Sequence, residues 1–199
     1  KKLSIQVLGD QLIHVSATPE IDFPKDSSLI IVPKKRSAPF TISEIGDSLL
    51  LATNKLNVMI SSLDGGILFK DKDGRLILAE KSGGGKLFSP IEVENTKGFT
   101  VRQIFDSPKD EAFYGLGQQW WRFNYKNKSE ELFQYNTKVS VPFIISNKNY
   151  GLLWDSYSLS RFGDSRPFEQ LNTIFRLYNK EGKSGSLTGT YSAPENGTD

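Results

Sequence analysis

The sequence contains no cysteine and only one histidine, His14, and these two shortages exclude several kinds of catalytic chemistry. A disulfide scaffold and thiolate catalysis both need cysteine. A zinc site needs a cluster of Cys and His ligands, and a Ser-His-Asp triad needs a histidine beside its nucleophile. His14 lies in an alternating run, residues 12–15, so we interpret it as a strand residue that is packed or exposed on a sheet.

Neither sign of charge dominates, since 25 basic residues stand against 23 acidic ones and the net charge is +2. A nucleic-acid-binding face needs clustered basic residues. The one basic run, Lys34-Lys35-Arg36, follows a proline and is interpreted as a solvated turn. No apolar run reaches the roughly 20 residues of a membrane-spanning helix. We therefore expect neither a nucleic-acid partner nor a membrane span.

Helical periodicity is also missing, because no window of about a dozen residues shows an apolar stripe spaced at 3.6 residues. Apolar and polar residues alternate instead, as in half-buried strands, in residues 3–7, 56–60 and 99–105. In the last of these stretches Phe99, Val101 and Phe105 share one face. Short apolar runs at residues 29–32 and 49–51 predict strands that are covered on both faces.

Glycine-containing turns separate these strand patterns. Asp64-Gly65-Gly66 and Lys72-Asp73-Gly74 each lie between two apolar runs, which is typical of β-hairpins. Gly83-Gly84-Gly85 predicts a flexible connection. Neither this glycine run nor the aspartate-rich turn has the spacing of a phosphate loop or a calcium loop. The pattern as a whole predicts an all-β sandwich of about a dozen strands.

Residues 106–137 interrupt this rhythm, because they are polar and aromatic with little alternation. Loops of such length are usually functional or disordered, and the many rings argue against disorder, so we predict one long ordered loop. A second change begins at residue 179, where a linker-like stretch precedes a new strand pattern at residues 187–191. The sequence thus predicts a β-sandwich domain over residues 1–180 and a separate segment over residues 181–199.

Acidic residues near the long loop are the remaining candidates for catalysis, because a pair of carboxylates can hydrolyse a glycosidic bond. Asp106, Asp110 and Glu111 flank this loop. Asp110 and Glu111 immediately precede a predicted strand end, where solvated acids are common. Asp155 closes a strand, as a turn residue would. We therefore assign no catalytic residue in this chain.

The densest group of rings lies in the stretch FYGLGQQWWRFNY, whose two glycines permit a tight backbone or the close approach of another segment. Flat rings beside amides suit a pyranose, whose C–H faces stack and whose hydroxyls form hydrogen bonds. The candidates for such a binding role are Gln118, Gln119, Trp120, Trp121 and Asn124. The alternative is core packing of the two indoles on different layers, because neighbouring strand residues face opposite ways.

Three stretches of the chain resemble glycoside hydrolase family 31, which holds α-glucosidases and α-xylosidases. FYGLGQ at residues 113–118 is similar to the signature near the end of the family's N-terminal β-domain. VPFIIS at residues 141–146, followed by YGLLWD at residues 150–155, is similar to the strand pair that comes next. Residues 49–80 are similar to the family's paired strands around an Asp-Lys-Asp-Gly turn, here residues 71–74.

The resemblance covers roughly residues 3–180 and implies the N-terminal β-supersandwich, of the galactose mutarotase type, of a retaining α-glycosidase. In that family the domain packs on a (β/α)8 barrel, which carries both catalytic aspartates. No stretch here matches those catalytic motifs, and no alternation of strands and helices could build the barrel. The resemblance therefore implies a glycoside hydrolase in which this part is non-catalytic and inactive by itself. It implies no metal and no organic cofactor.

The resemblance also assigns the loop after the Gly-Leu-Gly turn to the wall of the substrate pocket. By position this loop is residues 118–125, and Asn136 closes its far end. The Gly-Gln after the turn is most similar to α-xylosidases that act on xyloglucan fragments, so an oligosaccharide of that kind is the expected substrate. Some of those enzymes carry an inserted carbohydrate-binding module. Residues 186–191 are similar to its opening strand, so residues 181–199 are interpreted as a linker and the start of such a module.

Polysaccharide-degrading relatives imply a periplasmic, secreted or cell-surface location. No signal peptide is visible, and the chain begins at Lys1-Lys2-Leu3 as it would after removal of one or after a cut in the polypeptide. Two other functions stay open. One is a stand-alone carbohydrate-binding β-sandwich with the rings as its platform. The other is a mutarotase-like domain acting alone, which lacks a second histidine for acid–base work at the anomeric carbon.

Overall fold

The computed structural model describes residues 2–23, 28–31, 37–119, 123–164, 176, 178–179 and 181–184. The chain divides into two compact units, Lys1–Gly163 and Asp164–Asp199. All strands of the described residues lie in the first unit, and the predicted all-β class is confirmed. The domain boundary placed near residue 180 stays a prediction, and the strand pattern at residues 187–191 lies outside the described residues. Within the ranges given above, no helix could span a bilayer.

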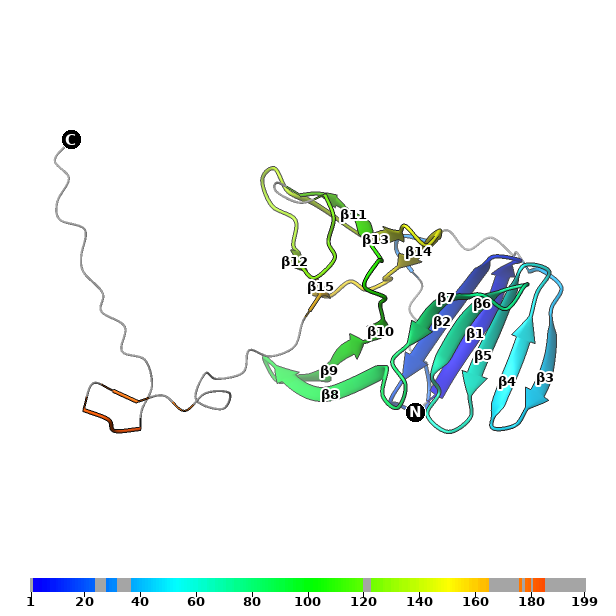
Figure 1. Cartoon of the computed structure of the whole chain (residues 1–199), viewed down its shortest axis with the longest axis horizontal. Helices are drawn as coiled ribbons and strands as arrows, with labels where there is room; N and C mark the ends of the chain where they lie inside the picture. Colours follow the sequence, from blue (N-terminus) through cyan, green and yellow to red (C-terminus); the bar gives the residue numbers. More distant parts are fainter. Residues whose placement is uncertain are drawn as a thin grey trace. The chain divides into compact units, whose positions relative to one another are not determined.

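Among the described residues, fifteen strands form five sheets (Figure 1). They are β1 (Lys2–Gly9), β2 (Leu12–Thr18), β3 (Thr41–Ile45), β4 (Ser48–Ala52), β5 (Leu56–Ser61), β6 (Ile67–Asp71), β7 (Leu76–Glu80), β8 (Lys86–Val93), β9 (Thr96–Gln103), β10 (Phe105–Asp106), β11 (Phe113–Gln118), β12 (Ser129–Leu132), β13 (Val139–Ser146), β14 (Tyr150–Leu153) and β15 (Ser160–Gly163). The largest sheet has the order β10-β7-β6-β5-β4-β3, and the others are β11-β13-β14, β1-β2, β8-β9 and β12-β15. The two predicted hairpins are confirmed as β5–β6 and β6–β7, and the predicted strand pair is β13–β14.

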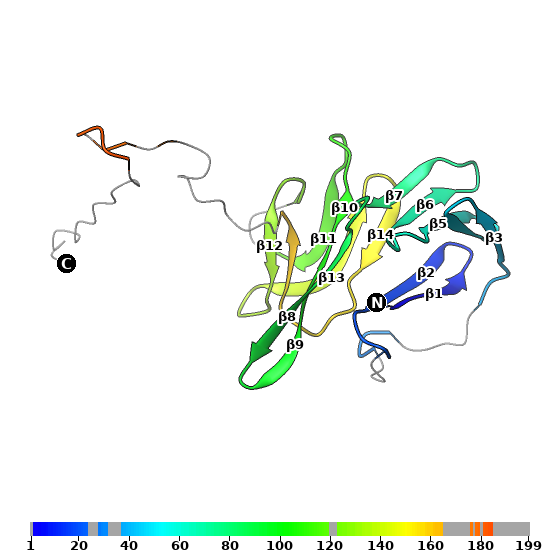
Figure 2. The same ribbon diagram turned by 90° about the horizontal axis from the view of Figure 1, so that it is seen from below.

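The six-stranded sheet and the β1–β2 pair pack on each other as two layers, which Figure 2 shows from below. Val7 of β1 clusters with Leu51, Val58 and Ile67 of the larger sheet, and all four are at most 7% exposed. The side chains packed around them are Leu3, Ile5, Ile13, Val15, Ala38, Ile60 and Phe69. Each fully buried aliphatic side chain contributes roughly 1.5–3 kcal/mol, so this cluster stabilises the packing of the two layers.

A buried ion pair ties the connection between β7 and β8 to the sheet. Glu80 is 5% exposed and pairs with the Lys86 ammonium, which also donates to the Gly65 carbonyl at 3.0 Å. Burial raises the pKa of Glu80. Asp64 accepts a hydrogen bond from the Gly83 N–H at 3.0 Å. The glycine-rich connection, which the sequence predicts to be flexible, is thus anchored at both of its ends.

The prediction of a single long loop at residues 106–137 is wrong, because this stretch contains β11, β12 and part of β10. β11 pairs with β13, and β12 pairs with β15. Their inner faces meet in a second core of Leu116, Tyr125 and Ile144, with Phe113, Leu132, Leu152 and Phe162 packed around it. The alternation of β11 is hidden in the sequence because Gly115 and Gly117 contribute no side chain to either face.

The buried strand predicted at residues 29–32 is wrong for the part that the structure describes. Leu29 and Ile30 are 81% and 53% exposed, and neither belongs to a strand. The Ser28 hydroxyl accepts hydrogen bonds from the N–H groups of Ile30 and Ile31 at 3.2 and 2.9 Å, so a local turn replaces sheet pairing. The end of this run and the basic run after it lie outside the described residues.

The strand predicted over residues 99–105 divides into two that belong to different sheets. β9 pairs with β8, whereas β10 pairs with β7. Between them the Ile104 N–H donates to the Gly85 carbonyl at 2.7 Å, which takes the chain from one sheet to the other. The run at residues 49–51 is confirmed as part of β4, but only Leu51 among its leucines is buried, so the expected cover on both faces is incomplete.

A bulge interrupts the ladder between β11 and β13, and three successive residues in it have positive φ angles. The angles are 114° at Gly115, 61° at Leu116 and 87° at Gly117, and the register shifts between the two glycines. A Cβ atom on Gly115 would lie 2.6 Å from the Phe143 carbonyl oxygen, and one on Gly117 would lie 2.2 Å from that of Val139. Neither position accepts a side chain, so both glycines are needed for the close approach of the two strands.

We expect Gly117→Ala to lower the free energy of unfolding by at least about 2 kcal/mol, because the added methyl would collide with the backbone of β13. Urea unfolding followed by tryptophan fluorescence measures the loss. Gly98→Ala in β9 is the matched control, since nothing lies within 4 Å of the Cβ that it adds. Its stability should stay within about 0.5 kcal/mol of the unaltered chain. Equal, small losses in both variants would contradict the close-approach role.

Candidate functional site

Gln118 and Gln119 lie at the end of the ladder that β11 shares with β13. Gln118 is exposed and pairs with Val139. The Nε2 group of Gln119 donates to the Leu116 carbonyl at 2.8 Å and to the Val139 carbonyl at 3.4 Å. Its Oε1 atom is buried and accepts no hydrogen bond from the described residues. Gln119 therefore braces the bulge and fixes the start of the following loop, whereas Gln118 is available to a ligand.

Asn124 lies at the opposite end of β11. Its Oδ1 atom accepts hydrogen bonds from the N–H groups of Phe113 and Lys126 at 3.2 and 3.0 Å, and the Tyr125 N–H donates to the Phe113 carbonyl at 2.9 Å. A strand of this length spans roughly 16 Å, so the loop leaves β11 at one end and returns to the other. The structure therefore does not bring Asn124 together with the two glutamines.

The two indoles of the predicted site, Trp120 and Trp121, lie outside the described residues, as does Arg122. Their role in binding a sugar stays a prediction. The structure gives the anchors of the loop on either side of them, which are the backbone contacts of Gln119 and the ring contact of Phe123.

The remaining rings of this stretch divide between core and surface. Tyr125 is 2% exposed, and its ring centroid lies 6.4 Å from that of Phe162 in the second core. Phe123 is 83% exposed and contacts Tyr114, with 5.2 Å between the ring centroids. Tyr125 therefore packs in the core, whereas Phe123 is exposed to the solvent.

Asn136 forms the turn between β12 and β13. It is exposed, its φ angle is 45°, and the bridge between Tyr135 and Lys138 closes the turn around it. Because Val139 pairs with Gln118, this turn stands at the same end of the sheet as the two glutamines. The structure thus brings three of the candidates that it describes, Gln118, Gln119 and Asn136, to one end of the sheet.

Sequence reasoning missed two rings beside Asn136. Phe133 and Tyr135 are 54% and 60% exposed, and their ring centroids lie 5.8 Å apart. The signal was present in the stretch FQYN, where rings and amides alternate as they do in the loop after β11. Its significance was hidden because the whole region was predicted as one loop, without the strands that bring its two parts to the same end of a sheet.

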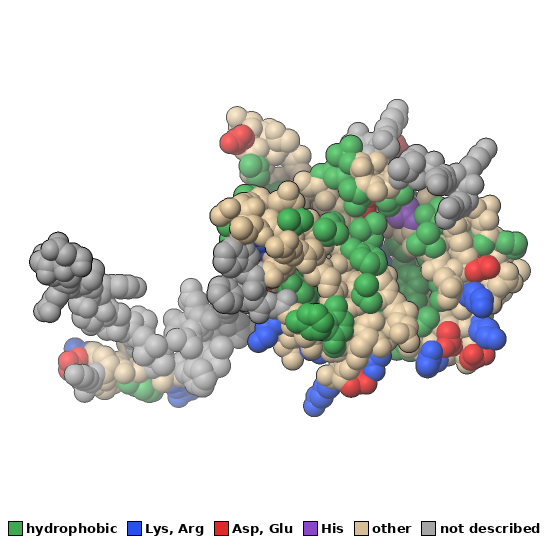
Figure 3. Space-filling view, turned by 90° about the horizontal axis from the view of Figure 1, so that it is seen from above, with side chains coloured by type: hydrophobic (Ala, Val, Ile, Leu, Met, Phe, Trp, Pro, Cys, Tyr) green, Lys and Arg blue, Asp and Glu red, His purple; other side chains and the backbone are tan. Residues whose placement is uncertain are grey.

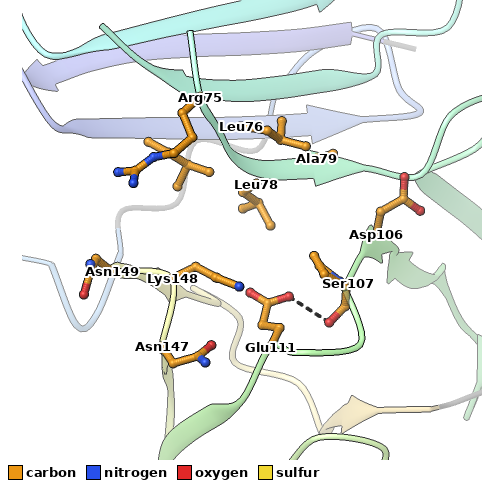
Figure 4. Close-up of a pocket in the computed structure, with 12 residues that line it drawn as sticks. Arg75, Leu76, Leu78, Ala79, Asp106, Ser107, Glu111, Asn147, Lys148 and Asn149 are labelled. Atoms are coloured by element: carbon orange, nitrogen blue, oxygen red, sulfur yellow. Dashed lines mark hydrogen bonds between the residues drawn. The ribbon is translucent and has the colours of Figure 1, made fainter. Parts of the chain in front are cut away.

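A separate pocket of about 760 Å³ lies between β7, the segment after β10 and the turn between β13 and β14 (Figure 4). Glu111, which the sequence analysis expects to be solvated, is 3% exposed, so that expectation is wrong. Its carboxylate accepts hydrogen bonds from the hydroxyls of Ser107, Ser146 and Tyr150 at 2.8, 2.6 and 2.7 Å. The three hydroxyls engage both carboxylate oxygens, so Glu111 joins the segment before β11 to β13 and β14.

The neighbouring groups of this pocket are also engaged in structural contacts. Burial raises the pKa of the Tyr150 hydroxyl, and the hydrogen bond to Glu111 raises it further. Asp110 is exposed and pairs with Lys148, whose hydrogen bond lowers the pKa of Asp110. These polar contacts join elements that are distant in the sequence, while the apolar side chains of β7 line the other side of the pocket.

Comparison with known proteins identifies relatives of this chain. The family described as the glycosyl hydrolase 31 N-terminal galactose mutarotase-like domain matches residues 2–162. An α-xylosidase from Saccharolobus solfataricus is 29% identical over 168 residues, which covers 79% of this chain and 22% of that protein.

Solved structures give the same picture. The GH31 α-xylosidase of Xanthomonas citri is 41% identical, with a TM-score of 0.78, and the match covers 92% of this chain and 20% of that one. A GH31 α-xylosidase from a soil metagenome, solved with xylose, is 26% identical with a TM-score of 0.65, over 80% of this chain and 26% of that one. The chain therefore spans about a fifth to a quarter of the length of these relatives.

We expect the Tyr150 hydroxyl to make the fold sensitive to alkaline pH. Tyrosine in the unfolded chain loses its proton near pH 10, whereas folded Tyr150 has a raised pKa and keeps its proton, so the unfolded state gains stability as the pH rises. Tyr150→Phe should cost about 1 kcal/mol at neutral pH through the lost hydrogen bond. Urea unfolding between about pH 8 and pH 11 should show this difference shrinking above pH 10. Parallel pH curves for the two proteins would contradict this expectation.

Proposed function

The chain belongs to glycoside hydrolase family 31, as its N-terminal galactose mutarotase-like domain, and we propose that it serves a longer retaining α-glycosidase as a non-catalytic domain. The observation that carries the proposal is the family match over residues 2–162, together with α-xylosidases as similar proteins. Because the chain spans only part of the length of those proteins, hydrolysis belongs to the longer polypeptide. The proposed activity is that of an α-xylosidase or an α-glucosidase.

An uncovered apolar sheet face supports the packing of a further domain against this one. On one face of β13, Ile144 and Ser146 are buried. On the other face four apolar side chains are 38–49% exposed, namely Val139, Val141, Phe143 and Ile145. An antiparallel sheet with one face in solvent normally carries polar residues there. We propose that a (β/α)8 catalytic domain of the same polypeptide covers this face.

Exposed apolar surface is not confined to this strand. In Figure 3, apolar side chains gather in the middle of one face of the first unit. Aliphatic side chains in a row offer no hydrogen bonds to a hydroxyl-rich sugar, and they suit a packed protein surface. The apolar faces are therefore assigned to protein contacts, and sugar contacts are assigned to the aromatic loop.

The proposed substrate is an oligosaccharide with an α-linked xylose or glucose, such as a fragment of xyloglucan. One aspartate of the barrel would attack the anomeric carbon and a second would protonate the leaving oxygen, with the carboxyls about 5–5.5 Å apart. This domain would contact the sugar through Gln118, the indoles of Trp120 and Trp121, and Asn136. No cofactor takes part. We propose a role in carbohydrate metabolism and, from the family resemblance, a periplasmic, secreted or cell-surface location.

Hydrolysis assays test this proposal directly. The 199-residue chain should release no nitrophenol from aryl α-xylosides or α-glucosides, because it would lack both catalytic acids, whereas the longer polypeptide that contains it should do so. Clear turnover by the chain alone would contradict the non-catalytic role. Micromolar oligosaccharide binding by the chain, with no hydrolysis by the longer polypeptide, would instead favour a stand-alone carbohydrate-binding module.

The aromatic loop is tested by Trp120→Ala and Trp121→Ala in the longer polypeptide. Loss of one stacking ring should raise KM by about fivefold, since such contacts contribute roughly 1 kcal/mol, and the melting temperature should change little. Phe40→Ala, which removes a ring that is 47% exposed outside this loop, is the control and should leave KM unchanged. A collapse of the melting temperature with an unchanged KM would show that the indoles are core residues.

A further inference from the structure

The turn between β12 and β13 carries two exposed rings that lie outside the loop already proposed for the pocket. Phe133 and Tyr135 are each more than half exposed, and their ring planes are inclined by 36° at a centroid distance of 5.8 Å. Single exposed apolar residues need no explanation, but two adjacent exposed rings form an apolar ledge with two flat faces inclined to each other. Such a ledge can stack against the C–H face of a sugar ring.

Contacts beneath the rings hold this turn in place. The Lys138 ammonium pairs with the Glu130 carboxylate and donates to the Glu131 carbonyl at 2.9 Å, and the side chains of the ion pair are each only 14% exposed. Tyr135 and Lys138 exchange backbone hydrogen bonds at 3.3 and 2.8 Å, and the Phe133 N–H donates to the Glu131 carbonyl at 3.0 Å. Because the ledge is formed in advance, a ligand loses little free energy in ordering it.

The charges around the ledge compensate each other. Besides the ion pair beneath the turn, Arg161 of β15 contacts Glu131 of β12 at 3.0 Å, so two positive groups face two negative ones. A charged ligand therefore gains little from these groups. Gln134, Asn136 and Thr137 are exposed beside the rings and supply amide and hydroxyl groups. Exposed ring faces bordered by neutral hydrogen-bonding groups match a neutral pyranose.

We propose that the Phe133–Tyr135 ring pair is a second saccharide-binding platform, which stacks one neutral pyranose ring. The platform stands at the end of the β11–β13 ladder from which the aromatic loop departs, because Val139 pairs with Gln118. The inference rests on the proposed function for the kind of ligand and extends it. The platform would hold a unit of the oligosaccharide other than the one whose bond is cleaved.

NMR titration of the 199-residue chain with a xyloglucan oligosaccharide tests the platform without any hydrolysis. The ring resonances of Phe133 and Tyr135 should shift in a saturable way, with a Kd in the millimolar range typical of a single stacked sugar. Phe133→Ala and Tyr135→Ala should each weaken binding by about fivefold or more. Phe133→Leu keeps an apolar side chain without a flat face and should weaken binding as the alanine variant does. Phe40→Ala is the control and should leave the Kd within about twofold.

Several results would overturn the platform. They are unchanged affinity in the Phe133→Ala and Tyr135→Ala double variant, saturable shifts confined to other residues of the unaltered chain, and no shifts at about 50 mM sugar. The shifts in the unaltered chain do not depend on whether a variant folds. Tighter binding of glucuronate than of xylose would also overturn it, because the charges around the ledge compensate each other. Hydrolysis by the longer polypeptide without ring shifts in the 199-residue chain would contradict the platform but not the proposed function. Ring shifts without hydrolysis would contradict the proposed function but not the platform.

Discussion

The close approach of β11 to β13 at the Gly-Leu-Gly bulge is the contact on which the rest of the candidate site depends. No Cβ fits at Gly115 or Gly117, so the two backbones touch directly and a displacement of one strand displaces the other. The loop after Gln118, the turn before Val139 and the apolar face of β13 all begin at this contact. Leu116, which holds a positive φ angle inside the second core, stores strain at the same place.

Polar groups with little exposure fix the positions of the remaining elements, and each of these groups lies where two or more elements meet. Glu111 joins the segment before β11 to β13 and β14, Glu80 holds the connection from β7 to β8, and Lys138 holds the turn with the ring pair. Removing a charged group from water is costly, but each of these groups forms at least two hydrogen bonds, which offset part of that cost. The surfaces left over are of two kinds: aliphatic rows that suit a protein, and rings bordered by amides that suit a sugar.

Local patterns were enough to predict the strand class and two hairpins, whereas the β13–β14 pair came from the family resemblance. Alternation with a period of two residues and the chemistry of Asp-Gly turns act between near neighbours, so both are visible without a structure. The motif FYGLGQ also carried the resemblance to the family, and in this chain its two glycines are required by the close approach of β13. Where side chains were small or charged, as in β11 and β12, the same reasoning missed the strand.

Contacts between distant residues decided everything else about the site. The burial of Glu111 depends on hydroxyls 35 and 39 positions away in Ser146 and Tyr150, which no local pattern reports. The same holds for the separation of Asn124 from the glutamines and for the exposure of Phe123 beside a buried Tyr125, since both follow from where the loop rejoins β11. Pairing register places side chains from separate stretches at one end of a sheet, and register exists only once the strands have met.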